Sequence, residues 1–146
     1  MKEDISKIEM AEALASFAHK GQKDKAGKPY IYHPLAVKER VEGEKEKITA
    51  LLHDVIEDTF ITLETVRNIF GDEIAEAVDA MTHKEGEDYF EYVERLSHNP
   101  ISRRVKLADL SHNMDLSRIP NVTERDLQRL EKYKKAEKFL LEKEGK

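Results

Sequence analysis

A histidine and three carboxylates interrupt an apolar run near the middle of the chain, in the segment LLHDVIEDT (51–59). The ionisable residues of this segment are His53, Asp54, Glu57 and Asp58. On an α-helix, which turns about 100° per residue, these four share one face and the aliphatic residues share the other. Most charged faces are simply solvated, but no lysine or arginine balances this one, and like charges one turn apart destabilise a helix by about 0.2–0.5 kcal/mol. The segment therefore favours a site for a divalent cation.

Adjacent His and Asp residues rarely complete a metal site alone, because a hard cation such as Mn²⁺ or Mg²⁺ takes about six ligands. The further candidate ligands are His19, His33, His83, His98, His112 and Asp109. Asp109 stands out because it lies in a largely apolar helical segment, RVKLADLSHNM (104–114), where a buried carboxylate needs a partner. A single histidine on such a helix is more often a core residue with satisfied hydrogen bonds, and we interpret His112 in that way.

Helical spacing of apolar residues recurs along the chain, and no segment alternates with a period of two. This predicts an all-α fold, a helical bundle of about seven to eight helices in one domain. We expect helices around residues 10–18, 35–42, 46–58, 62–81, 89–96, 102–116 and 123–144. Thr62 and Thr123 are the expected N-caps of two of them, and Gly71 is expected to interrupt the fourth. The segment 21–34 contains two glycines and two prolines and is predicted to be a loop.

Length and composition exclude several classes of protein. The 146 residues suit one domain, and the net charge of −5 argues against a nucleic-acid partner. The chain has no cysteine, which excludes disulfides, thiolate metal ligands and cysteine nucleophiles. No run approaches the ~20 apolar residues of a membrane span, so we expect a cytoplasmic protein. The sequence leaves the oligomeric state open and is compatible with a homo-oligomer.

Four longer sequence segments, here called sequence words, indicate which protein family the chain resembles. In order along the chain they are AHKGQKDKAGKPYIYHPLAV (18–37), ALLHDVIEDT (50–59), FGDEIAEAVDAMT (70–82) and RRVKLADLSHNM (103–114). Together they resemble the HD-type hydrolase domain of RelA/SpoT homologues, which removes the 3′-pyrophosphate from the alarmones ppGpp and pppGpp. The resemblance covers roughly residues 8–118, and the chain is similar to the stand-alone small alarmone hydrolases. It implies one hydrolase domain over 1–146, with a C-terminal helix at about 123–144.

The resemblance also implies a role for each matching residue. The implied ligands of one Mn²⁺ ion are His33, His53, Asp54 and Asp109. The implied catalytic pair is Glu57 and Asp58, which would position the attacking water and assist its proton transfer. The implied contacts with a small-molecule nucleotide substrate are Lys25, Tyr30, Asn113 and Tyr89.

The chain departs from the family at positions that would recognise the nucleoside. Asp24 replaces a residue that is mostly arginine, Leu110 replaces an arginine, and Asp115 with Leu116 replaces an Arg-Thr pair. The implied metal ligands are unchanged. The first hypothesis is therefore a (p)ppGpp 3′-pyrophosphohydrolase with changed or broadened substrate choice. The alternatives are an HD phosphohydrolase for another nucleotide, such as a nucleoside monophosphate or NADPH, and a non-catalytic alarmone-binding module.

Overall fold

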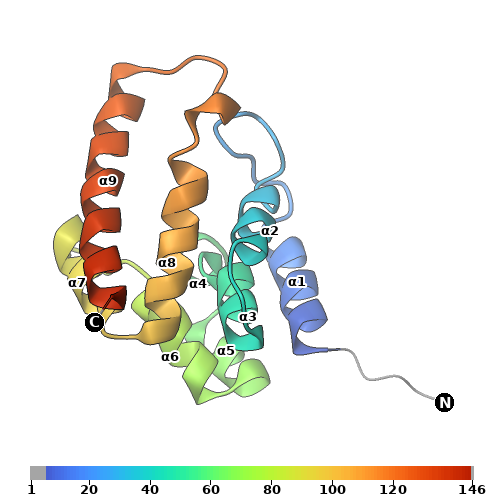
Figure 1. The fold of residues 1–146 in the computed structure, drawn as a ribbon. Coiled ribbons are helices and arrows are strands. Elements are labelled where there is room, and N and C mark those ends of the chain that lie inside the picture. Colours follow the sequence, from blue (N-terminus) through green and yellow to red (C-terminus); the bar gives the residue numbers. More distant parts are fainter. Residues whose placement is uncertain (1–5, 146) are drawn as a thin grey trace.

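The computed structural model describes residues 6–145. Within that range the chain folds into α-helices and one short 3₁₀ helix, with no β-strand (Figure 1). The elements are α1 (Lys7–Ala18), α2 (Tyr32–Glu39), α3 (Glu44–Leu52), α4 (Val55–Asp58), α5 (Leu63–Phe70), α6 (Asp72–Ala80), α7 (Tyr89–Ser97), α8 (Pro100–Asn113), η1 (Leu116–Arg118) and α9 (Glu124–Glu144). The predicted all-α class is confirmed. Among these helices none is long and apolar enough to cross a membrane.

Helices α2, α3 and α8 pack against one another at the centre of the bundle. In Figure 1, α8 lies between α9 on one side and α2 and α3 on the other. Leu51 and Leu52 of α3 are completely buried in the core, and burying such a side chain stabilises the fold by about 1.5–3 kcal/mol. The apolar residues of the central segment therefore anchor α3 where its C-terminal end meets both α2 and α8.

Helix ends follow the capping signals in the sequence. The side chain of Thr62 accepts a hydrogen bond from the amide of Thr65 at the start of α5. Thr123 and Asp126 form a reciprocal capping box at the start of α9. Gly71 separates α5 from α6 with a φ of 95°, a conformation that side chains disfavour and glycine adopts readily. These three expectations are confirmed.

The single helix predicted over residues 46–58 is wrong, because the structure divides it into α3 and α4. The His53 side chain explains the break. Its Nδ1 donates a hydrogen bond of 2.6 Å to the carbonyl of Ala50, which in an uninterrupted helix would accept from the amide of Asp54. His53 and Asp54 consequently lie in a turn between the two helices, and Glu57 and Asp58 belong to a separate helical turn.

Candidate metal-binding and hydrolytic site

Three predicted metal ligands converge from the three central helices. His33 lies in α2, His53 follows α3, and Asp109 lies in α8; all three are buried. The Oδ1 atom of Asp109 lies 2.7 Å from His33 Nε2 and 3.4 Å from His53 Nε2. One ligand atom from each residue falls within 4.8 Å of the others. Two imidazoles and a carboxylate at this spacing match the ligand types that divalent transition metals take.

The environment of His53 tests whether a cation fits this cluster. Because Nδ1 donates to the backbone, a neutral His53 ring would present the lone pair of Nε2 to the interior. This Nε2 is buried and has no hydrogen-bond partner within the described residues, although Asp54 Oδ2 lies 3.0 Å away and Asp109 Oδ1 lies 3.4 Å away. A lone pair facing two anionic oxygens is unfavourable unless a proton or a metal ion lies between them. The arrangement therefore fits a divalent cation.

The ionisation of the cluster follows from the same geometry. Burial disfavours the charged form of His53, but the Asp54 and Asp109 carboxylates outweigh it and hold the pKa of the imidazole well above its usual value. Burial likewise opposes ionisation of Asp109, but Lys106, followed by the two histidines, holds the pKa of that carboxyl well below its usual range. A proton thus takes the position that a cation would occupy, and metal binding is expected to release it.

Asp109 has two further partners on its own helix. Lys106 Nζ donates to Oδ2 at 2.9 Å, and Asn113 Nδ2 donates to Oδ1 at 3.1 Å. The Lys106 side chain is buried, and its ammonium lies 5.2 Å from the centroid of the Tyr92 ring. Asn113, which the resemblance places beside the sugar, therefore also orients Asp109.

Asp54, the fourth ligand implied by the resemblance, lies beside the three-residue cluster rather than within it. Its Oδ2 faces His53 Nε2 and accepts a hydrogen bond from the Tyr30 hydroxyl. Burial, followed by the charge of Asp54, raises the pKa of Tyr30, which keeps the hydroxyl protonated as a donor. The loop that precedes α2 thereby fixes the Asp54 carboxylate beside the cluster.

Replacing Tyr30 by phenylalanine removes this donor while keeping the ring. We expect Tyr30→Phe to weaken Mn²⁺ binding about 10-fold, the lower end of the effect usual for a residue that orients a metal ligand. Isothermal titration calorimetry on the purified protein measures it. Tyr32→Phe is the matched control, because the Tyr32 side chain is exposed. Equal Mn²⁺ affinity in the two variants would show that the hydroxyl does not act on Asp54.

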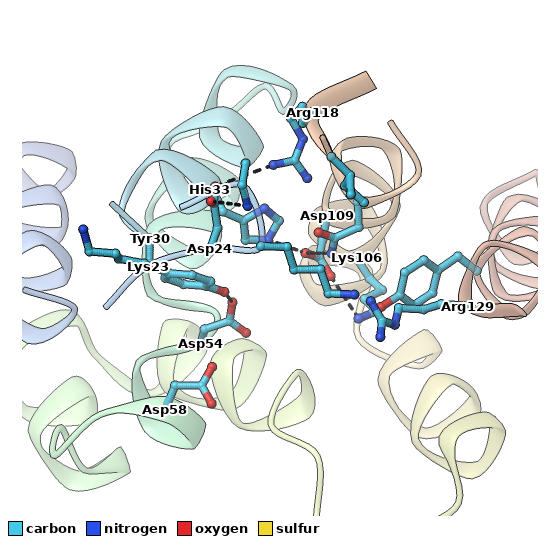
Figure 2. Close-up of a pocket in the computed structure, with 15 residues that line it drawn as sticks. Lys23, Asp24, Tyr30, His33, Asp54, Asp58, Lys106, Asp109, Arg118 and Arg129 are labelled. Carbon is cyan, nitrogen blue, oxygen red and sulfur yellow. Dashed lines mark hydrogen bonds and ion pairs between the residues drawn. The ribbon is translucent and has the colours of Figure 1, made fainter. Parts of the chain in front are cut away.

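A pocket of about 390 Å³ opens beside the cluster. Its lining includes His33, Asp54, Asp58, Asp109 and Tyr30 together with the cations Lys23, Lys25, Lys106, Arg118 and Arg129. Figure 2 shows Asp54 and Asp58 on one side of the pocket, with Lys106 and Arg129 across from them. A metal centre that opens into a space lined by five basic side chains suits an anionic ligand, such as one carrying phosphate groups.

The structure separates the two residues of the implied catalytic pair. Asp58 lines the pocket, and partial desolvation, together with Asp54 and Glu57, raises the pKa of its carboxyl to about 6. Glu57 is not a lining residue; its Oε1 accepts a hydrogen bond of 2.7 Å from the backbone N–H of His83. In this conformation Asp58 faces the substrate space, whereas Glu57 ties α4 to the loop that follows α6.

The other residues implied to contact substrate also differ in their placement. Lys25 lines the pocket and donates to Asp126 Oδ1 at 3.1 Å. Tyr89 lies outside the pocket lining, and its buried hydroxyl finds no hydrogen-bond partner within residues 6–145. Its ring instead packs 5.8 Å from the ammonium of Lys106. Tyr89 therefore supports the wall behind Lys106.

Asp24, the departure from the family in the basic loop, has a structural role here. Its Oδ1 accepts hydrogen bonds from the amides of Ala26 and Lys28, both at 2.9 Å, which closes the loop. Its Oδ2 faces the guanidinium of Arg118 in η1 at 3.8 Å. Asp24 thus joins the loop to the segment that follows α8.

Sequence reasoning missed three residues that line the pocket near α9, namely Arg118, Arg129 and Tyr133. They come from η1 and from the helix that packs along α8. The Thr123–Asp126 capping box predicted where α9 begins, but no pattern in the sequence predicted the neighbour against which it packs. Lys106 carried a detectable signal, because it lies three residues before Asp109 and hence on the same side of a helix.

The helical fold and the buried His-His-Asp cluster define a helical metal-binding domain. The chain belongs to the HD domain family, which matches its residues 11–136. It is 34% identical over 129 residues to a GTP pyrophosphokinase of Myxococcus xanthus, covering 76% of this chain and 17% of that protein. It is 31% identical over 128 residues to the bifunctional (p)ppGpp synthase/hydrolase SpoT of Escherichia coli (strain K12), covering 77% of this chain and 18% of that protein.

The match to these curated relatives thus covers less than a fifth of their length. Among solved structures the chain is similar to one described as "A metazoan ortholog of SpoT hydrolyzes ppGpp and plays a role in starvation responses". The TM-score is 0.78 at 24% sequence identity, covering 97% of this chain and 88% of the other, which shows a shared fold. The resemblance predicted from the sequence words is confirmed.

Proposed function

We propose that this chain is a Mn²⁺-dependent nucleotide phosphohydrolase in a single domain, with (p)ppGpp as the first candidate substrate and pyrophosphate as the product. One observation carries the proposal: the cluster of His33, His53 and Asp109 opens into a pocket that five basic side chains also line. The names of the relatives support the choice of substrate, because several are guanosine-3′,5′-bis(diphosphate) 3′-pyrophosphohydrolases.

The divalent ion, when bound, would polarise a phosphoryl oxygen and lower the pKa of a water ligand. The residues of the chain supply the other parts of the reaction. The Asp58 carboxylate faces the pocket and can accept a proton from the attacking water. Lys106 and Arg129, across the pocket from Asp58 (Figure 2), can donate hydrogen bonds to phosphate oxygens. Glu57 holds the loop after α6 through the amide of His83, which keeps α4 and Asp58 in place.

Purified protein with Mn²⁺, offered a panel of nucleotides, tests this proposal. We expect ppGpp and water to give GDP and pyrophosphate, measured by separating the nucleotides and assaying pyrophosphate and phosphate separately. The Asp54→Ala variant, with its helical content checked by circular dichroism, is the negative control. If the protein hydrolyses the alarmone no faster than Asp54→Ala does, but hydrolyses NADPH or a nucleoside monophosphate, then (p)ppGpp is not its substrate and the other nucleotide is. Alarmone binding without any turnover would instead establish a binding module.

The departures from the family favour including those other nucleotides in the panel. The Asp24 carboxylate is held by two backbone amides and faces Arg118, and Leu110 is completely buried in the core. Neither residue presents a free cation to a nucleoside. The metal cluster and its basic wall would therefore serve the phosphate groups, while the selection of the base can differ from that of the family.

A further inference from the structure

His112 is a buried imidazole that none of the roles above uses. It lies in α8, one turn after Asp109, and it does not line the pocket. Its ring stacks on that of His33, with centroids 5.0 Å apart and an angle of 29° between the planes. The two Nδ1 atoms are 2.8 Å apart, within hydrogen-bond distance.

The direction of this hydrogen bond follows from what His33 must do. The Nε2 atom of His33 faces Asp109 at 2.7 Å and is the atom that would bind a cation. A ligating Nε2 needs its lone pair, so the ring proton of His33 must lie on Nδ1, which then donates to His112. The Nδ1 atom of His112 must accept, which requires a neutral ring.

We propose that His112 is a positioning residue that fixes the tautomer and the orientation of His33 as a metal ligand. Histidine ligands generally donate their second N–H to a fixed acceptor, which holds the ring and raises its basicity. His53 follows this rule with the carbonyl of Ala50 at 2.6 Å. His112 is the corresponding acceptor for His33, so α8 supplies both a ligand, Asp109, and the group that orients a second ligand. The inference rests on the metal site of the proposed function and not on the identity of the substrate.

Two substitutions at this position separate an acceptor from simple packing. His112→Leu fills the space without an acceptor, whereas His112→Asn places a carbonyl oxygen near the position of Nδ1. We expect His112→Leu to weaken Mn²⁺ binding about 10–100-fold and His112→Asn to remain within a few-fold of the unsubstituted protein. His98→Leu is the matched control, because this histidine is exposed at the end of α7.

The readout is the Mn²⁺ dissociation constant, measured by calorimetry on protein whose folding is verified by circular dichroism. Folded His112→Leu that binds Mn²⁺ as tightly as the His98→Leu control would overturn the inference. Failure of the unsubstituted protein to bind Mn²⁺ would instead overturn the proposed function, so the two failures are distinguishable.

A second measurement needs no substitution and remains decisive if His112→Leu does not fold. Nitrogen-15 spectra of the protein loaded with Zn²⁺, a diamagnetic substitute, report which ring nitrogen of each histidine is protonated. We expect His33 to carry its proton on Nδ1 and His112 to carry its proton on Nε2. A proton on Nδ1 of His112 in the loaded protein would show that this ring does not accept from His33.

Discussion

Asp109→Asn is expected to abolish Mn²⁺ binding and hydrolysis and to lower the free energy of unfolding by about 3–5 kcal/mol, the usual effect of removing one partner of a buried ion pair. Asp109 supplies the carboxylate of the three-residue cluster, so the loss of its charge removes an anionic ligand. The same substitution leaves the buried ammonium of Lys106 without the carboxylate that lies 2.9 Å away. Calorimetry with Mn²⁺ and urea denaturation of the metal-free protein measure the two effects.

A second substitution separates stability from function. Lys106→Met in the Asp109→Asn background removes the unpaired charge, and a methionine side chain suits the neighbouring Tyr89 and Tyr92 rings. We expect the double variant to regain most of the lost free energy of unfolding and none of the Mn²⁺ binding. Asp109→Asn protein that still binds Mn²⁺ with unchanged affinity would show that the metal site lies elsewhere.

The sequence predicted helices well where the determinants are local. The capping residues Thr62 and Thr123 and the glycine at position 71 act within a few residues of their own backbone, and each acts as expected. The break between α3 and α4 is also local, but it depends on the His53 ring turning back to the Ala50 carbonyl. Helical periodicity indicates which face of a helix a side chain occupies, but not which backbone carbonyl the side chain binds. The break between α3 and α4 therefore could not be predicted from periodicity.

The residue types predicted a divalent-cation site at His53 and Asp54 and singled out Asp109, but only the resemblance gave the full set of candidate ligands. His33 and Asp109 are 76 residues apart in the chain. No spacing rule predicts that His33 Nε2 lies 2.7 Å from Asp109 Oδ1. The resemblance implied that both residues and His53 are ligands, and the structure brings the three together. It could not indicate that Glu57 would bind the amide of His83, or that Arg129 would reach the pocket from α9. These placements depend on packing between helices, which the pattern of a single helix does not contain.

For His112 the general expectation agrees with the structure but did not identify the specific contact. A buried histidine on an apolar helix is usually satisfied by some core partner, and His112 does have one. That partner is the Nδ1 atom of His33, a candidate metal ligand. The expectation that His112 is a satisfied core residue and the inference that it positions a ligand are therefore compatible, and only the identity of the partner distinguishes them.

Asp58→Asn is expected to lower kcat by about 10²–10⁴-fold, the usual contribution of a general base, with Mn²⁺ affinity changed much less. Asparagine keeps the shape of the side chain but cannot accept a proton from water. Asp72→Asn is the matched control, because Asp72 is an exposed carboxylate outside this pocket. Unchanged kcat in Asp58→Asn would exclude Asp58 as the base, and loss of Mn²⁺ binding would make it a ligand.

The same substitution should stabilise the metal-free protein above pH 6. Partial desolvation, then Asp54 and Glu57, raise the pKa of Asp58 from 3.8 to about 6, so the folded state favours the protonated carboxyl. As pH rises from about 4 to about 6, the unfolded chain releases this proton first, and the folded state loses stability until its own carboxyl ionises. Asparagine does not ionise.

We therefore expect a higher melting temperature for Asp58→Asn than for the unsubstituted protein at pH 7.5, and a smaller difference at pH 4.5. A difference that does not grow with pH would mean that the Asp58 carboxylate is not destabilised by its neighbours, and the case for a base tuned by Asp54 and Glu57 would fail with it.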